Sequence, residues 1–150
     1  MAKGKHLLYK HALLATDLSK QNDLLIKRAT TLAKKLDAKL SMAHVIEHAV
    51  IAYGGEFSLP IEMELETSLK KRAGKILMRL GKKYGVPKKR QYLLEGSVKN
   101  ALTCLAKKIS ADLIIVGAYQ HHHLGALLGS QASAILHAAK SDVWVIRIDD

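Results

Sequence analysis

Short apolar runs alternate with longer segments of helical periodicity along almost the whole chain. Five runs are predicted to be buried strands, at 12–16, 40–45, 91–94, 112–117 and 142–148. Between them, apolar residues recur every three to four positions in four segments, at about 22–36, 60–84, 98–109 and 129–139. Strict alternation of strand and helix is typical of a parallel sheet with helices on both faces. We therefore expect an open, parallel, five-stranded α/β sheet.

Connection rules limit how such strands can be ordered. Crossovers between parallel strands are right-handed, so few topologies are open to the chain. We expect the order 3-2-1-4-5. In this order the chain adds strands 2 and 3 on one side of strand 1 and strands 4 and 5 on the other, so the switch point lies between strands 1 and 4. Ligands of open α/β sheets bind at the carboxyl ends of the strands on either side of this switch point. The turns that follow 12–16 and 112–117 are therefore the candidate site.

Local signals mark the ends of the predicted helices. Asn22 or Asp23 can cap the first helix, and Ser97 can cap the third. Pro60 suits the first turn of the second helix. Gly85 and Pro87 are predicted to end that helix.

Length and composition fit one globular domain that covers 1–150. Of the 150 residues, 49% are hydrophobic and 25% are charged, which excludes a disordered chain. The one cysteine, Cys104, has apolar neighbours and is expected to be a small buried hydrophobe. No run approaches the roughly 20 apolar residues of a membrane span, so we expect a cytoplasmic protein with no membrane partner.

The formal net charge of +11 raises the question of nucleic acid binding. The 24 Lys and Arg residues are spread along the chain in short groups, mostly on predicted helices. One Phe and one Trp offer little for stacking with bases. We therefore interpret the charge mainly as solubility and general affinity for polyanions. A nucleic acid partner is the less favoured alternative.

Two turns carry the residues that could bind a ligand. Asp17 follows the first strand and could accept hydrogen bonds from a ribose hydroxyl or an adenine amine. Capping of the turn into the first helix is an equally good explanation. Gly129 and Ser130 stand at the head of the fourth helix, where free N–H groups suit a phosphate. A tight turn with Ser130 as N-cap explains them as well.

These motifs together resemble the universal stress protein family over nearly the full length. The run ALLATDLS at 12–19 is similar to the opening strand and acidic turn of that family. His44 and Val45 match its His-Val pair, and Glu95 and Gly96 precede the third helix as they do there. The runs ADLIIVG at 111–117, LLGS at 127–130 and VWVI at 143–146 complete the resemblance.

The resemblance implies a fold, a ligand and an assembly. The fold would be Rossmann-like, similar to the adenine nucleotide alpha hydrolases. One branch of the family binds ATP or AMP, with no metal beyond a Mg²⁺ that accompanies the nucleotide. The implied nucleotide-binding residues are Thr16, Asp17, Val45, Gly117, Gly125, Gly129, Ser130 and Gln131. Asp17 would contact the base or ribose, the Val45 backbone the adenine, and Gly117, Gly129 and Ser130 the phosphates. Homodimers of the family often form through the last strand, here from Val143 to Ile148.

The chain departs from the glycine signature of the ATP-binding branch. Gln120 stands where the motif has its middle glycine, and Gly129 comes one residue early relative to Gly117. The other branch, whose members are not known to bind ATP, is the alternative. Its members are nucleotide-free dimeric interaction modules. The three histidines at 121–123 are interpreted as part of a solvated loop. A contact with a phosphate is the next alternative, and a metal site is the least favoured.

The expected function is an adenine-nucleotide-binding sensor or adaptor in the stress response. A Walker-type Gly-Lys-Ser/Thr motif is missing from the sequence, and no clear general base follows the glycine segment. We therefore expect no enzyme activity beyond, at most, slow nucleotide hydrolysis.

Overall fold

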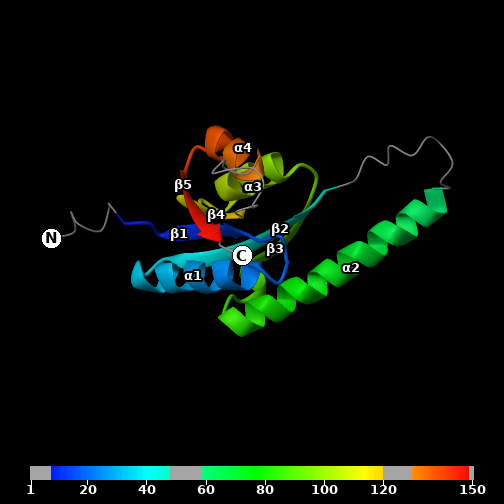
Figure 1. Ribbon diagram of the computed structural model, residues 1–150, viewed down its shortest axis with the longest axis horizontal. Helices are drawn as coiled ribbons and strands as arrows, with labels where there is room; N and C mark the ends of the chain where they lie inside the picture. Colours follow the sequence, from blue (N-terminus) through cyan, green and yellow to red (C-terminus); the bar gives the residue numbers. More distant parts are fainter. Residues whose placement is uncertain (1–7, 48–58, 120–129, 149–150) are drawn as a thin grey trace.

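The computed structural model describes residues 8–47, 59–119 and 130–148 (Figure 1). The strands are β1 (His11–Ala15), β2 (Lys39–Ile46), β3 (Gln91–Glu95), β4 (Leu113–Tyr119) and β5 (Asp142–Ile148). The helices are α1 (Asn22–Lys35), α2 (Leu59–Tyr84), α3 (Val98–Lys108) and α4 (Ser130–Ala138), with a 3-10 turn η2 (Lys88–Arg90). The strands form one sheet in the order β3-β2-β1-β4-β5, and every pairing is parallel. The predicted fold class and strand order are confirmed.

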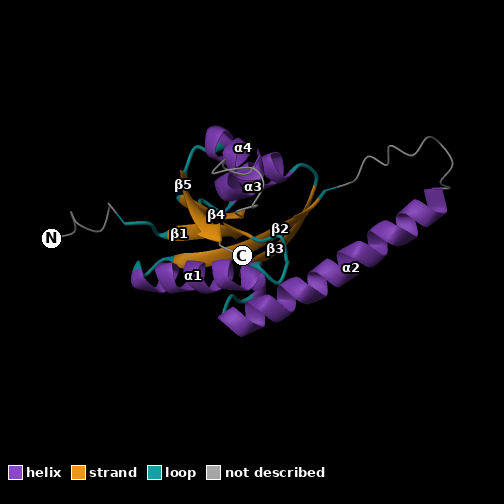
Figure 2. Ribbon diagram, viewed as in Figure 1, coloured by secondary structure: helices purple, strands orange, loops and turns teal. Residues whose placement is uncertain are grey.

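The sheet is covered on both faces, as the alternating strands require. α1 and α2 lie on one face, and α3 and α4 lie on the other (Figure 2). Leu14, Met42 and Ile115 point toward the first pair of helices and belong to one buried cluster. The neighbouring residues Leu13 and Ile114 belong to a second cluster, with α3 and α4. Because successive side chains of a strand point to opposite faces, burial on both faces favours apolar residues at nearly every position, and Ser41 of β2 is a buried polar exception.

β1 occupies the centre of the sheet and positions the switch point. It pairs with β2 on one side, where Ala15 aligns with Ala43, and with β4 on the other, where Leu14 aligns with Ile115. Leu13 and Leu14 have no exposed surface. The carboxyl ends of β1, β2 and β4 therefore lie side by side at the centre of the sheet.

The helix ends follow the predicted signals in two cases. Ser97 caps α3, because its hydroxyl accepts a hydrogen bond from the Asn100 N–H at 3.2 Å. α2 ends at Tyr84, and Gly85 follows with φ of +74°, a conformation that glycine adopts without strain.

Two residues beside core positions of the helices are exposed, and for one of them, Cys104, the prediction of burial is wrong. Leu24 is 48% exposed, because the buried residues of α1 (Leu25, Ile26 and Ala29) lie on another face of that helix. Cys104 is also exposed. The core-facing residues of α3 are Leu102, Leu105 and Ala106, and the helical rotation of 100° per residue turns Cys104 outward between them.

Candidate functional site

The loop after β1 is organised by a buried amide. Asn22 is 1% exposed, and its Oδ1 accepts hydrogen bonds from the Thr16 hydroxyl at 2.7 Å and from the Asp17 N–H at 3.0 Å. The Thr16 hydroxyl in turn accepts from the N–H of Leu18, a residue with φ of +64°. These hydrogen bonds fix the conformation of the turn.

This arrangement corrects the predicted cap of α1. Gln21 occupies the N-cap position, and no side chain forms a cap hydrogen bond there. Asn22 uses its carboxamide for the loop instead, because burial demands that its polar atoms find partners. Asp23 points toward α2, where its carboxylate accepts hydrogen bonds from Lys83 and Tyr84.

Asp17 has the turn-forming role that the sequence allowed, and its contact with a ligand stays a prediction. Its Oδ1 accepts a hydrogen bond from the Ser19 N–H at 2.8 Å, which is the turn-forming role. The residue is also exposed, and it lines a cavity at the switch point. The turn contact thus fixes the direction of the carboxylate and leaves it at the cavity wall.

The end of β2 supplies the opposite wall. His44 Nδ1 lies 2.8 Å from the Thr16 carbonyl oxygen. Since a carbonyl only accepts, Nδ1 carries a proton, and in the neutral tautomer with this arrangement Nε2 is an acceptor. Val45 is 8% exposed and borders the cavity, as does Glu47 just beyond the strand.

Gly117 in β4 has a packing reason to be glycine. A Cβ atom at this position would lie 3.0 Å from Cδ2 of Leu25, at the limit of what side-chain packing allows. The missing side chain lets α1 approach the sheet closely beside the cavity. This requirement is independent of any ligand.

The first turn of α4 also lines the site. Gln131 Nε2 donates a hydrogen bond to Glu47 Oε1 at 3.2 Å. This contact joins the end of β2 to the start of α4, two segments 84 residues apart. Ala132 and Ile135 continue the cavity wall along the helix.

Together these segments enclose a cavity of about 410 Å³. Ligand pockets in proteins commonly measure about 300–1,000 Å³. Its apolar walls include Leu25, Val45, Leu102, Val116 and Ile135. Its polar groups come from Thr16, Asp17, Asn22, His44, Glu47 and Gln131. A cavity with mainly apolar walls and a few polar groups suits a ring that carries hydrogen-bonding substituents.

The structure brings together five of the predicted site residues. Thr16, Asp17, Val45, Gly117 and Gln131 all line this cavity. Ser130 begins α4 immediately before Gln131. Gly125 and Gly129 lie outside the described residues, as do the histidines at 121–123. The contact of these residues with a nucleotide stays a prediction.

Sequence reasoning missed Asn22 as organiser of the loop and Glu47 as a wall residue. A signal for Glu47 was present, because it follows a buried strand as directly as Asp17 does. Nothing in the local sequence distinguished the role of Asn22 from helix capping.

The charge around the cavity differs from that of the chain. Asp17 and Glu47 contribute carboxylates, and no Lys or Arg is found among the described residues that line it. Ranges 8–47, 59–119 and 130–148 contain no group of three or more residues suited to hold a metal ion. Within the same ranges, no helix combines the length and apolar character needed to cross a bilayer.

The sequence matches the profile of a known family over most of its length. The profile of the Universal stress protein family matches residues 8–147. Universal stress protein A homolog 1 of Coxiella burnetii is 47% identical over 138 residues, which cover 92% of this chain and 96% of the relative.

Comparison of the structure gives the same fold. Universal stress protein UspA from Lactobacillus plantarum superposes with a TM-score of 0.76 at 22% identity, covering 93% of this chain and 99% of that one. A universal stress protein in complex with cAMP superposes with a TM-score of 0.59 at 23% identity, covering 93% and 97%.

Proposed function

The chain belongs to the universal stress protein family, and from that premise we propose that its cavity binds an adenine nucleotide. The protein would then act in the cytoplasm as a nucleotide-dependent sensor or adaptor of the stress response. One observation carries this proposal. The turn after β1 and the first turn of α4 line the same cavity at the switch point of the sheet.

The cavity offers a suitable place for each end of a nucleotide. Val45, Leu102 and Val116 form apolar walls that could hold a base. Asp17 and the Nε2 atom of His44 are acceptors for the ribose hydroxyls and the adenine amine. The phosphate would point toward Ser130, where the N–H groups at the head of α4 favour an anion.

The relative in complex with cAMP supports the same class of ligand. Its fold is shared with this chain, although its identity of 23% transfers no individual contact. AMP, ATP and cAMP are therefore the ligands with which the proposal is tested.

Isothermal titration calorimetry of the purified chain with AMP, ATP and cAMP tests the proposal directly. We expect binding of at least one of them. We expect Asp17→Asn, which keeps the turn contact with Ser19, to weaken it about tenfold through loss of a charged hydrogen bond. Asp37→Asn is the matched control, because Asp37 is exposed near the opposite end of β2.

No heat with any of the three ligands, and none bound after purification, would reject nucleotide binding. The remaining candidate would then be a nucleotide-free dimeric interaction module. Two observations favour it. Gly117 is explained by its packing on Leu25, and the described cavity wall offers no Lys or Arg to a polyphosphate.

Either function is expected to involve a homodimer formed through the last strand, from Val143 to Ile148. β5 is an edge of the sheet, and its residues 143–146 are partly exposed. An edge strand leaves backbone N–H and C=O groups available to a second copy.

A further inference from the structure

α2 is longer than the sheet that it covers. Its second half lies against β3 and α1, whereas its first half extends away from the rest of the molecule (Figure 1). Ala73 and Leu77 in the second half are 9% and 3% exposed. In the first half, Met63, Leu65 and Leu69 are 65%, 54% and 49% exposed. The helix therefore carries apolar side chains past the edge of its own core.

The exposed leucines continue the row that packs on the sheet. Leu65, Leu69, Ala73 and Leu77 follow one another at intervals of four, so they form one ridge on the helix surface. Lys70 forms an ion pair with Glu95 at the end of β3 and marks where the helix leaves the sheet. The ridge is thus covered by the core on one side of Lys70 and uncovered on the other.

The charges on the helix indicate what covers the rest. Glu64 and Glu66 lie in the first half, and Lys70 and Arg72 follow at the start of the second. Each of these four residues is next to a ridge residue in the sequence, so at 100° per residue they flank the ridge, whereas Lys71 and Lys75 lie on the opposite side of the helix. Two such helices in parallel would place like charges opposite each other. In the antiparallel orientation the acidic half of each helix faces the basic half of the other.

We propose that the first half of α2 is an interface with the α2 helix of a second copy, packed antiparallel around a two-fold axis between Leu65 and Leu69. Leu65 of each copy then opposes Leu69 of the other, as an isologous contact requires. Each copy contributes about three helical turns. The association is therefore weaker than that of a standard interface of about 1,600 Å². The surface is separate from the β5 edge, so it joins copies whether or not β5 also pairs.

Sedimentation equilibrium of the full chain tests the interface. We expect Leu65→Glu combined with Leu69→Glu to raise the dissociation constant of the association through α2 about 30-fold or more. Both residues are about half exposed, so the fold of a single copy should be unaffected, which circular dichroism verifies. Met78→Glu is the control, because Met78 is 51% exposed on the same helix but lies on another face. An unchanged mass in the double variant, or a monomeric wild type, would overturn the proposal.

Charge exchange and disulfide formation test the orientation. Glu64→Lys, and separately Arg72→Glu, should each weaken self-association, and mixing the two variants should restore it. With Cys104 replaced by Ser, Leu65→Cys and Leu69→Cys copies should form a mixed disulfide faster than either forms one with itself. Failure of mixing to restore association, or disulfides mainly between identical copies, would exclude the antiparallel pairing. These measurements use no nucleotide, so their outcome is independent of the proposed function.

Discussion

A single carboxamide sets the conformation of the turn that carries Asp17. Asn22 accepts two hydrogen bonds from that turn and is almost completely buried. An apolar replacement would leave the Thr16 hydroxyl and the Asp17 N–H without their acceptor in a buried setting. The free energy of leaving such groups unpaired is about 1–3 kcal/mol each.

We therefore expect Asn22→Leu to lower the free energy of unfolding by about 2 kcal/mol or more. Urea denaturation measures this change. Lys27→Ala, at an exposed position of the same helix, should change stability by less than about 0.5 kcal/mol. Equal stability of Asn22→Leu and wild type would show that the turn does not depend on the amide.

His11 gives stability a dependence on pH. Its ring lies between the Ile109 carbonyl at 3.1 Å and the Ser41 hydroxyl at 2.8 Å, and burial lowers its pKa from the ordinary value of 6.5. The unfolded chain therefore binds this proton more tightly than the folded protein. The neutral ring therefore makes its whole contribution to stability above about pH 6.5, and this contribution is lost as the pH falls toward the pKa of the folded state.

We expect the loss of stability between neutral pH and about pH 5 to be smaller in His11→Gln than in wild type. Denaturant titrations at several pH values, taken as differences between variant and wild type, isolate this contribution. His137→Gln is the control, because His137 is exposed on α4. An identical pH slope for wild type and His11→Gln would contradict the assignment.

α2 is fixed to the body at its second half by contacts that tolerate little change. Lys83 and Tyr84 donate hydrogen bonds to Asp23 of α1, and these contacts lower the pKa of the Asp23 carboxyl. Gly81 packs so closely that a Cβ atom would overlap the amide of Gln91 and lie 2.9 Å from the Val86 carbonyl oxygen. Gly74, in the same helix, would place a Cβ atom in ordinary contact with Leu93, at 3.8 Å.

The two glycines should therefore respond in opposite directions to alanine. We expect Gly74→Ala to stabilise the protein by about 0.5–1 kcal/mol, the gain in helix propensity. Gly81→Ala should destabilise it by about 1–3 kcal/mol, because overpacking outweighs the same gain. Thermal unfolding of both variants measures the difference, and a stabilised Gly81→Ala would show that the Gln91 side chain moves aside without loss.

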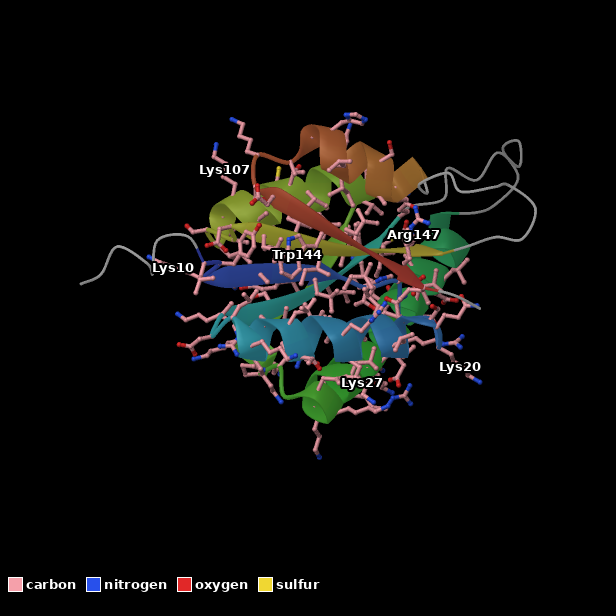
Figure 3. The ribbon with its side chains drawn as sticks, turned by 60° about the vertical axis from the view of Figure 1, so that its left-hand side comes forward. Lys10, Lys20, Lys27, Lys107, Trp144 and Arg147 are labelled. Atoms are coloured by element: carbon pink, nitrogen blue, oxygen red, sulfur yellow. The ribbon has the colours of Figure 1, made fainter. Side chains whose placement is uncertain are left out.

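The cationic charge of the molecule is spread over its surface. Lys10, Lys20, Lys27, Lys107 and Arg147 lie apart from one another in Figure 3 and belong to different elements or to the loops between them. Trp144 stands on β5, with its ring edge-to-face to Tyr9 at a centroid distance of 5.4 Å. It is the one tryptophan of the chain, so its fluorescence reports on the β5 edge.

Dilution should separate the two proposed interfaces. We expect the Trp144 emission to shift to longer wavelength as copies joined through β5 dissociate and the partly exposed ring meets water. The variant with Leu65→Glu and Leu69→Glu should keep this shift, because its defect lies in α2. Constant emission across a change in mass would argue against association through β5.

The amino-acid sequence by itself determined the order of the elements, the parallel sheet and the place of the candidate site. Apolar runs of this kind are stable only when they are buried on both faces, and alternation with helices joined by right-handed crossovers leaves few arrangements of the strands, of which 3-2-1-4-5 is the one expected. The carboxyl ends of β1 and β4 then had to be neighbours. Thr16, Asp17, Val45, Gly117 and Gln131 consequently line one cavity.

Tertiary structure alone decided which side chains are covered and what each polar group contacts. Leu65 and Leu69 share a ridge with Ala73 and Leu77, yet they are exposed because α2 extends past the end of β3, where Lys70 pairs with Glu95. The bond between Glu47 and Gln131 joins segments 84 residues apart, which no local pattern specifies. Periodicity determines the apolar face of a helix, whereas burial depends on how far the neighbouring elements extend.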